Sequence, residues 1–569
     1  MSDTSTRSRQ PFARSLPLAA ALRLGRPSDT WFKPALSVVV ASAVPHLTLL
    51  ALGRLDLVMY AMAGSLCALY GHGLPYARRA RTVAGVVLSM AGGLAVALVT
   101  ASLTHSTAVL VAVGALLAAA QKVACDAVRI GPPGQVILTF VSSAALFAPQ
   151  RLGQVPAHLA LTLAGGAIAW LVCTGPALIR REGPERRAVA RALEAAADCA
   201  AEPGPRTRHR AAAAVHAAWQ CLLASGRPTS VRRSLERLVV YAEAAVAFAH
   251  PDDPEQLRAW AVRTRARGPV PEPPAAPGTA DELYGIEAER AVLRASGGRR
   301  AARRALRRGL GPGSPLLPVA VRTLTGCALA GYLCAALGVG RPYWAIVTAA
   351  SLYQANITLT WNRALQRTLG NLAGVVVFAA VLPLSRTGPL ALVLCCLFFS
   401  FAAEALITRN YWLGSVAVTP MALLVLEFGG AHPAGELIGD RVLDTILGAL
   451  AGFLAAALVT NRRAAGRVVR AIEAAARART EAERALERPH AERARARRAL
   501  TASLVELREA ADIAAGEWWQ RALPEQELLA AERAGHRTLA ATAQRLGPSA
   551  RAPRTRRGEV ARAPSIGAA

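Results

Sequence analysis

Long apolar runs alternate with short charged loops along this chain of 569 residues. A membrane-crossing helix needs about 20 largely apolar residues. Runs near this length fall into two groups of six, and a long polar segment separates the groups. The first group covers residues 35–53, 56–72, 84–103, 107–125, 134–150 and 157–179, and the second covers 316–338, 343–359, 369–385, 388–408, 411–429 and 441–460. This pattern predicts an all-α membrane protein that crosses the bilayer twelve times.

The polar segments are rich in Ala, Arg, Glu and Leu at helical spacing, which predicts amphipathic helices outside the membrane. Residues 268–278, with five prolines and two glycines, are incompatible with a helix or strand and predict a linker. The predicted organisation is a basic leader (1–34), a six-helix membrane repeat (35–180), a cytosolic helical domain (181–314), a second six-helix repeat (315–461), a C-terminal cytosolic helical domain (462–547) and a disordered basic tail (548–569).

The two halves resemble each other in sequence. Ser65-Leu66 and Arg81-Thr82 recur as Ser351-Leu352 and Arg367-Thr368, at an offset of 286 residues. After the sixth run of each half, residues 191–197 and 470–476 agree at six of seven positions. Each repeat would contain an even number of crossings, so the repeats are expected to run parallel, related by a pseudo-two-fold axis along the membrane normal.

Charge sets the expected orientation. Lys and Arg total 66 against 37 Asp and Glu, a net charge of +29. The arginines concentrate in alternate loops and beside the membrane repeats, for example at Arg78, Arg79, Arg180 and Arg181. By the positive-inside rule, both termini are expected in the cytosol, with the protein in the cell (inner) membrane. Because most of the positive charge borders membrane runs, anionic lipid is the expected partner rather than nucleic acid.

Motifs of soluble enzymes are absent from the sequence. It contains no G-x-x-x-x-G-K-[ST] phosphate loop, no H-E-x-x-H and no C-x-x-C. Most of the nine cysteines lie inside apolar runs, which excludes a secreted disulfide scaffold. We therefore expect neither an enzyme nor a cofactor or metal site.

The candidate functional residues begin with the segment after the eighth run. Arg363 and Arg367 are four residues apart, and would share a face at the cytosolic mouth if this turn is helical. Two guanidinium groups there would attract carboxylates, because the arginine fork donates two bonds at once. The alternative is a pair of anchors among lipid headgroups. Tyr343 and Trp344 are expected in an aromatic belt at the outer lip.

Carboxylates inside the apolar runs are the second group of candidates, because a buried charge needs a partner or a function. Glu404 could couple transport to protons, or form a static pair with Arg367 or Arg409. Asp440 and Asp444 share a helix face at the outer start of the twelfth run, and Arg441 is three residues from Asp444. These residues indicate either a locally neutralised helix start or an outer gate or proton site. The corresponding stretch of the first half lacks both carboxylates.

These residues resemble a known family. The stretch Tyr343-Trp344-Ala345, Arg363, Gln366-Arg367-Thr368-Leu-Gly370 and Gly374, followed by Asn410-Tyr411, Thr419-Pro420, Arg441, Asp444-Thr445 and Gly448, is similar to the fusaric acid resistance protein-like (FUSC) family. That family includes bacterial exporters of aromatic carboxylic acids and is similar in layout to plant aluminium-activated malate transporters. The resemblance is clear over 315–460 and weaker over 35–180. The matched positions are Trp344, Arg363, Arg367, Thr368, Gly370, Asn410, Arg441 and Asp444.

The resemblance implies efflux of organic, often aromatic, acids, with the lipid bilayer and small organic anions as partners. The leading hypothesis is an exporter whose cytosolic arginines recruit the carboxylate and whose Glu404 or Asp444 couples efflux to protons. A passive anion channel is the second hypothesis. A membrane scaffold whose cytosolic helices bind a protein partner is the third. The sequence leaves the substrate and the oligomeric state open, including a homo-oligomer.

Overall fold

The structure is a computed structural model that describes residues 21–25, 31–225, 229–248, 254–272, 314, 316–339, 341–459, 464–488, 490–517 and 524–544. Helices account for all the regular secondary structure in these ranges. Most of the predicted linker 268–278, and the tail from residue 545, lie outside the described residues. The all-α class is therefore confirmed for the part of the chain that the structure describes.

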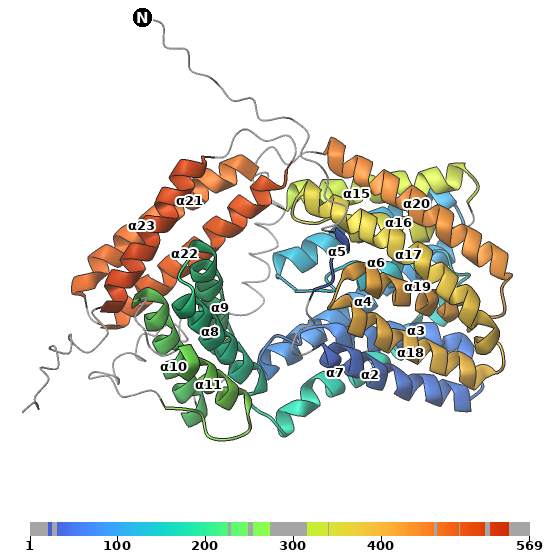
Figure 1. The fold of residues 1–569 in the computed structure, drawn as a ribbon. Helices are drawn as coiled ribbons and strands as arrows, with labels where there is room; N and C mark the ends of the chain where they lie inside the picture. The colour runs from blue at the N-terminus through green and yellow to red at the C-terminus, as the bar shows by residue number, and fades with distance from the viewer. Residues whose placement is uncertain are drawn as a thin grey trace, which may run out of the picture.

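Two groups of apolar helices form the membrane bundle, on the right in Figure 1. The first group is α2 (Phe32–Ala51), α3 (Val58–Ser65), α4 (Tyr76–Leu103), α5 (Thr107–Ala127), α6 (Val136–Leu146) and α7 (Val155–Thr174). The second group is α15 (Leu317–Ala336), α16 (Pro342–Leu352), α17 (Ile357–Ser385), α18 (Pro389–Ile407), α19 (Tyr411–Glu427) and α20 (Ala434–Leu458). All twelve predicted apolar runs thus coincide with helices.

Only eight of these helices are long and apolar enough to cross a bilayer in the described residues: α2, α4, α5, α7, α15, α17, α18 and α20. The chain is a multi-pass membrane protein, but twelve full-length crossings are not confirmed. The four short helices are α3, α6, α16 and α19, with 8, 11, 11 and 17 residues. An 11-residue helix is about 16 Å long, half of the roughly 30 Å hydrocarbon core.

Local sequence explains why two of the short helices, α6 and α16, are not longer. α6 follows Gly131-Pro132-Pro133-Gly134, where proline removes donors and glycine takes a positive φ of 63° at Gly134. α16 stops at Leu352, and α17 restarts at Ile357 because the Asn356 side chain caps it, accepting a hydrogen bond from Leu359 N at 2.9 Å. All eleven residues of α16 are buried, so its ends lie inside protein rather than lipid, as a broken helix requires.

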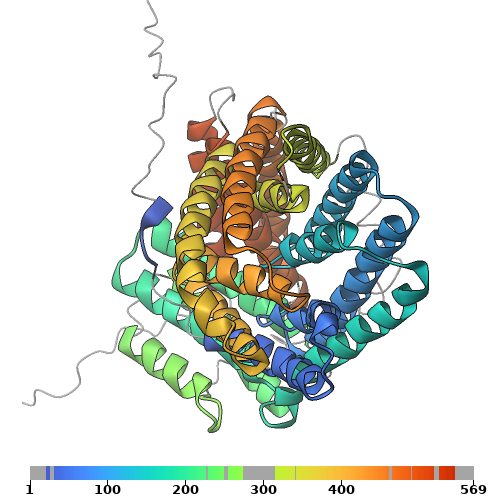
Figure 2. The ribbon, with the colours of Figure 1, turned by 90° about the vertical axis from the view of Figure 1, so that its right-hand side faces the viewer.

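The two groups pack reciprocally (Figure 2). α2 of the first group packs against α18 of the second, and α15 of the second packs against α5 of the first. In each group the second helix packs on the sixth, α3 on α7 and α16 on α20. The short helices therefore lie inside the bundle, and the long helices surround them.

Amphipathic helices form two further bundles on one side of the membrane bundle, on the left in Figure 1. The first amphipathic bundle is α8 (Gly183–Ala201), α9 (Pro205–Leu223), α10 (Ser230–Phe248) and α11 (Pro254–Arg265). The second is α21 (Ala464–Arg484), α22 (His490–Ala515) and α23 (Glu525–Gln544). A buried ion pair joins them: Arg497 Nη2 lies 3.0 Å from a carboxylate oxygen of Glu243.

Candidate functional site

Two arginines of α17 surround the Tyr411 side chain. The guanidinium carbon of Arg363 lies 3.8 Å from the centre of the Tyr411 ring. Arg367 Nη1 donates a hydrogen bond to the Tyr411 hydroxyl at 2.9 Å. Tyr411 is the first residue of α19, so this contact fixes the start of that helix against α17.

The position of these arginines differs from the expected one. The predicted ninth membrane run begins at residue 369, whereas α17 begins at Ile357. Both arginines therefore lie within the first three turns of a 29-residue helix rather than in a loop. Arg367 is only 5% exposed, and its Nε has no hydrogen-bond partner among the described residues, which disfavours the role of a headgroup anchor for this side chain.

Arg441 of α20 is buried beside Trp344 of α16. Its guanidinium carbon lies 3.9 Å from the centre of the Trp344 ring, a cation–π contact. Arg441 is 1% exposed, yet its Nε and Nη1 have no hydrogen-bond partner in the described part of the chain. A buried guanidinium with free donors is costly unless an anion reaches it.

The expected aromatic belt is wrong for Tyr343 and Trp344, because both side chains are buried inside the bundle, at 6% and 2% exposure. The belt rule failed here because α16 is not a crossing helix. Its first residues lie against α6 and α20, with Phe140 stacking on Trp344 at a centroid distance of 5.3 Å.

Asp444 lies one turn after Arg441 on α20. It is fully buried, and its two carboxylate oxygens lack a hydrogen-bond partner among the described residues, with the Cys334 thiol, a weak donor, beside them. The neutralisation expected at this helix start comes instead from Arg341, whose Nε is 3.4 Å from Asp440. Asp444 is thus an uncompensated carboxylate close to Arg441 in the chain.

Asn371 joins three helices and was not among the predicted residues. Its side-chain nitrogen donates to Thr445 Oγ1 of α20 at 3.1 Å, and its oxygen accepts from Thr419 Oγ1 of α19 at 3.0 Å. The signal was in the sequence: Arg363, Arg367 and Asn371 recur every four residues and so follow one face of α17. We call Arg363, Arg367, Asn371, Arg441 and Asp444 the polar stripe.

Close helix packing places the polar stripe. A Cβ atom on Gly370 would lie 2.5 Å from the Trp412 carbonyl oxygen of α19, and one on Gly374 would lie 2.8 Å from the Val416 carbonyl oxygen. On α20, a Cβ on Gly448 would lie 2.6 Å from the Ala345 carbonyl oxygen of α16. These three glycines allow the backbones to approach as the G-x-x-x-G pattern predicts.

Arg409 and Asn410 lie apart from the polar stripe contacts, at the junction of α18 and α19. The Asn410 side chain caps α19, and its nitrogen donates to the carbonyl oxygens of Ala21 at 3.0 Å and Arg23 at 2.8 Å. The Arg409 carbonyl accepts a hydrogen bond from Gly25 N at 2.8 Å. Both residues therefore hold residues 21–25 against the bundle.

Glu404 lies in α18 and is partly buried. Neither Arg367 nor Arg409 forms an ion pair with it among the described contacts, so the expected static pairs are not formed there. Arg81, which corresponds to Arg367 in the sequence repeat, is exposed. In the first group the buried arginine is instead Arg79 of α4, whose guanidinium donates to the carbonyl oxygens of Gly71 and Cys173, whereas the polar stripe belongs to the second group.

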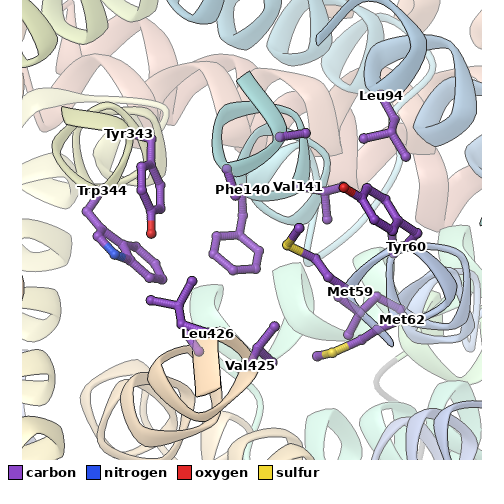
Figure 3. A pocket seen from close by; sticks show the side chains of 15 residues that line it. Met59, Tyr60, Met62, Leu94, Phe140, Val141, Tyr343, Trp344, Val425 and Leu426 are labelled. Carbon is purple, nitrogen blue, oxygen red and sulfur yellow. The ribbon is translucent and has the colours of Figure 1, made fainter. Parts of the chain in front are cut away.

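A small apolar pocket lies inside the membrane bundle, with about 30 Å³ of space that a water-sized sphere can occupy. Side chains from all four short helices line it, as Figure 3 shows for Met59 of α3, Phe140 of α6, Trp344 of α16 and Leu426 of α19. We call it the central pocket. Trp344 belongs both to this wall and to the contact with Arg441, so the pocket lies next to the polar stripe.

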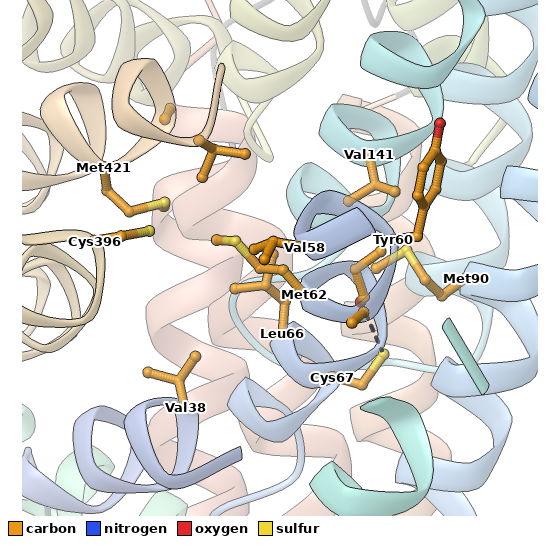
Figure 4. Close-up of a cluster of buried hydrophobic side chains, with 14 of the residues drawn as sticks. Val38, Val58, Tyr60, Met62, Leu66, Cys67, Met90, Val141, Cys396 and Met421 are labelled. Atoms are coloured by element: carbon orange, nitrogen blue, oxygen red, sulfur yellow. Dashed lines mark hydrogen bonds between the residues drawn. The ribbon is translucent and has the colours of Figure 1, made fainter. Parts of the chain in front are cut away.

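The surroundings of the central pocket are tightly packed and apolar. In Figure 4, Val58, Met62 and Leu66 extend towards Cys396 and Met421 of the second group. Among the described residues, no group of three or more His, Cys, Asp and Glu side chains is placed to hold a metal ion. The site therefore offers apolar contact, aromatic faces and cationic donors.

These features define a class of protein: a polytopic helical membrane protein with an aromatic pocket beside buried arginines. Residues 328–455 match the family model described as fusaric acid resistance protein-like, which confirms the resemblance over that segment. The match contains α16, α17, α18 and α19 entirely, together with Arg441 and Asp444.

Two curated proteins are similar to this chain. An uncharacterized membrane protein, YvaC of Bacillus subtilis (strain 168), is 30% identical over 207 residues, which is 35% of this chain and 32% of the relative. An uncharacterized protein of Haemophilus influenzae is 33% identical over 150 residues, 25% of this chain and 20% of the relative. The chain thus spans a third or less of these relatives. No solved structure matches the chain.

Proposed function

We propose that this protein transports organic anions, with aromatic carboxylic acids as the substrate class, from the cytoplasm across the cell (inner) membrane. One observation carries the proposal: Trp344 lines the apolar central pocket while its ring lies 3.9 Å from the buried, incompletely bonded guanidinium of Arg441. An aromatic acid has the same two parts, an apolar ring and a carboxylate, side by side.

The chemistry of each part fits this substrate class. Phe140, Tyr343 and Trp344 offer aromatic faces, which favour offset or edge contacts with a substrate ring. The Nε and Nη1 atoms of Arg441 have no hydrogen-bond partner among the described residues, and each can donate a charge-assisted hydrogen bond to a carboxylate oxygen. The space that a water-sized sphere can occupy is about 30 Å³, below the roughly 300–1,000 Å³ of small-molecule sites, so the lining side chains have to move apart for a substrate ring to enter.

The polar stripe supplies a route to the pocket. Arg363 and Arg367 lie nearest the end of α17 that contacts the second amphipathic bundle, where the Thr358 backbone nitrogen donates to Gly516 O at 3.1 Å. Substrate carboxylate would first meet these arginines, whose field raises local anion concentration. The hydrogen bonds of Asn371 to Thr445 and Thr419 would have to open for it to continue to Arg441.

Proton coupling is assigned here to Asp444 rather than to Glu404. Asp444 lies in the polar stripe one turn from Arg441, whereas Glu404 belongs to α18, which contributes no residue to the stripe. A proton taken up by Asp444 would remove the negative charge that competes with the substrate for Arg441. Exchange of proton and carboxylate at one arginine would then couple their movements.

We further propose that the membrane bundle consists of two parallel repeats, each followed by a cytosolic helical bundle, with both termini in the cytosol. The reciprocal packing of α2 on α18 and α15 on α5 supports this duplication. The exposed position of Arg81 and the backbone partners of the buried Arg79 support different roles for the repeats, in which the second carries the polar stripe and the first contributes apolar wall to the central pocket.

Flux measurements in proteoliposomes test the proposal. Liposomes containing the full chain are loaded with radiolabelled 4-hydroxybenzoate at pH 8, where the carboxylate is ionised and leak is slow, and release is compared with protein-free liposomes. We expect release above the protein-free level for 4-hydroxybenzoate, stimulated by an imposed pH gradient, and release at that level for malate. Arg441→Gln should lower the rate at least tenfold.

A surface arginine provides the matched control. Arg477→Gln removes one charge from α21 at a side chain that is 72% exposed, and should leave the rate within twofold of the original protein. Equal release of malate would contradict the aromatic substrate class. Release that ignores the pH gradient would favour a passive channel, and the absence of protein-dependent release would refute transport.

A further inference from the structure

A second hollow lies where the membrane bundle meets the first amphipathic bundle. Its volume is about 580 Å³, and it is open to solvent between the start of α2, the chain after α7, the start of α8 and the end of α11. Seven cationic side chains and one carboxylate, Glu182, line it. We call it the basic pocket. It shares no lining residue with the central pocket or the polar stripe.

Two of these cations hold the walls together. Arg186 donates from Nη1 to the carbonyl oxygens of Ala266 and Gly268, both at 3.0 Å, and so ties α8 to the end of α11. Arg265 of α11 pairs with Glu194 of α8, with 2.7 Å between Arg265 Nη2 and Glu194 Oε2. Their donors are engaged with protein, and the basic pocket therefore has a defined shape.

Three further cations of the basic pocket are Arg180, Arg181 and Arg267. All three side chains are exposed, and none of them has a hydrogen bond or ion pair among the described contacts. Lys33, in the first turn of α2, adds a further charge to the same hollow. These groups form a concentrated positive field whose donors are available to an anion with several oxygen atoms.

Exposed apolar side chains border these charges. Leu178 is 87% exposed and Ile179 is 77% exposed, and they immediately precede Arg180 in the chain. Phe32, at the start of α2, also lines the hollow and is 40% exposed. Since α7 and α2 are membrane-crossing helices, these apolar groups lie where acyl chains end and headgroups begin.

We propose that the basic pocket binds an anionic phospholipid, with its phosphate among Arg180, Arg181 and Arg267 and its acyl chains against Leu178, Ile179 and Phe32. The order of apolar and cationic groups along this surface matches the order of chain and phosphate in a phospholipid. A free phosphate ion would use the same arginines, but nothing in it would contact the three apolar side chains. The bound lipid would connect the membrane helices α2 and α7 to α8 and α11.

Native mass spectrometry of the full chain in detergent tests this assignment. The protein is titrated with phosphatidylglycerol and, separately, with phosphatidylcholine. We expect saturable retention of phosphatidylglycerol at least tenfold tighter than of phosphatidylcholine. The triple variant Arg180→Gln/Arg181→Gln/Arg267→Gln should lose this preference, whereas the matched triple variant Arg206→Gln/Arg210→Gln/Arg495→Gln, which removes equal charge from exposed sites elsewhere, should keep it.

Two further measurements distinguish binding of a phospholipid from binding of a soluble phosphate. Leu178→Ser/Ile179→Ser should weaken phosphatidylglycerol binding at least fivefold without changing the melting temperature by more than 2 °C. Millimolar glycerol 1-phosphate and inorganic phosphate should fail to displace the bound lipid. Displacement by either compound, or equal loss of binding in both triple variants, would overturn the proposal. Because the basic pocket is separate from the central pocket, failure here leaves the transport test unaffected.

Discussion

Arg441 lies over the face of the Trp344 ring, with 3.9 Å between its guanidinium carbon and the ring centre. The contact joins α20 to α16, and it is the point where the buried charge of the polar stripe meets the wall of the central pocket. A cation–π contact that is shielded from water is worth about 2 kcal/mol. This contact therefore serves both stability and the proposed recognition of a ring and a carboxylate together.

Replacing Trp344 should separate these two roles. Trp344→Phe keeps an aromatic face for Arg441, and we expect it to retain at least a third of the 4-hydroxybenzoate flux. Trp344→Leu removes the face and should lower flux at least tenfold, with a loss of about 1–2 kcal/mol in stability from the missing cation–π contact. Proteoliposome flux and thermal unfolding in detergent measure the two effects. Equal flux in both variants would exclude the ring from recognition.

Close packing of α20 on α16 predicts different effects for two glycines of one helix. Gly448→Ala places a Cβ 2.6 Å from the Ala345 carbonyl oxygen, and we expect destabilisation by about 1–3 kcal/mol, as for other overpacked sites. Gly439→Ala is the matched control, because no atom lies within 4 Å of its added Cβ. It should be neutral or stabilise the helix by up to about 1 kcal/mol. Thermal melts of the two variants compare them directly, and equal melting temperatures would contradict the packing argument.

A buried ion pair attaches the second amphipathic bundle to the membrane bundle. Arg322 of α15 and Glu517, just after α22, are 2% and 5% exposed, with 3.3 Å between Arg322 Nη2 and a Glu517 carboxylate oxygen. Removing one partner of a buried pair costs about 3–5 kcal/mol, because the other charge stays buried. Glu517→Gln should therefore be strongly destabilising. The double variant Arg322→Met/Glu517→Met should recover part of the loss, and additive losses in this double-mutant cycle would show that the pair is not coupled.

Protonation of His536 in α23 should weaken the fold at acidic pH. Burial lowers the pKa of this imidazole to about 4, and the positive charges of Arg208 and His209 act in the same direction. Between the unfolded-state pKa of about 6.5 and the folded-state value, the unfolded chain binds more protons. Stability therefore falls as the pH decreases through this range, by up to about 1.4 kcal/mol per pH unit.

The variant His536→Gln isolates this effect from other titrating groups. When the pH is lowered from 7.5 to 5.0, the melting temperature of this variant should decrease less than that of the original protein. His105→Gln is the control, since it replaces an imidazole near the far end of α4, away from the amphipathic bundles. Identical pH dependence of the original protein and His536→Gln would contradict the prediction.

The lengths of the apolar runs predicted where each helix of the membrane bundle lies in the sequence, but not whether that helix is long enough to cross the bilayer. The run 343–359 has the composition of a crossing helix, yet α16 ends at Leu352 and Asn356 caps the next helix, α17. The cap signal of a single asparagine is weak beside a long apolar run, so the short α16 was not predicted. The prediction of an aromatic belt at Tyr343 and Trp344 was wrong for the same reason.

Spacing along one helix predicted shared faces well, and contacts between helices poorly. The four-residue interval of Arg363 and Arg367 predicted one shared face, and both side chains contact Tyr411. It did not reveal that Arg441 would contact Trp344 rather than Asp444, because that choice depends on how closely Gly448 lets α20 approach α16. The partner of Arg441 depends on tertiary packing, which a single sequence does not reveal directly.

The residues that line the central pocket and the residues that face the bilayer belong mostly to different helices. α3, α6, α16 and α19 supply most of the central pocket, while the eight long helices supply the length needed to cross the bilayer. Under the proposed function, substitutions at lining residues such as Met59 or Phe140 would change which substrates are transported without altering the helix surfaces that contact lipid.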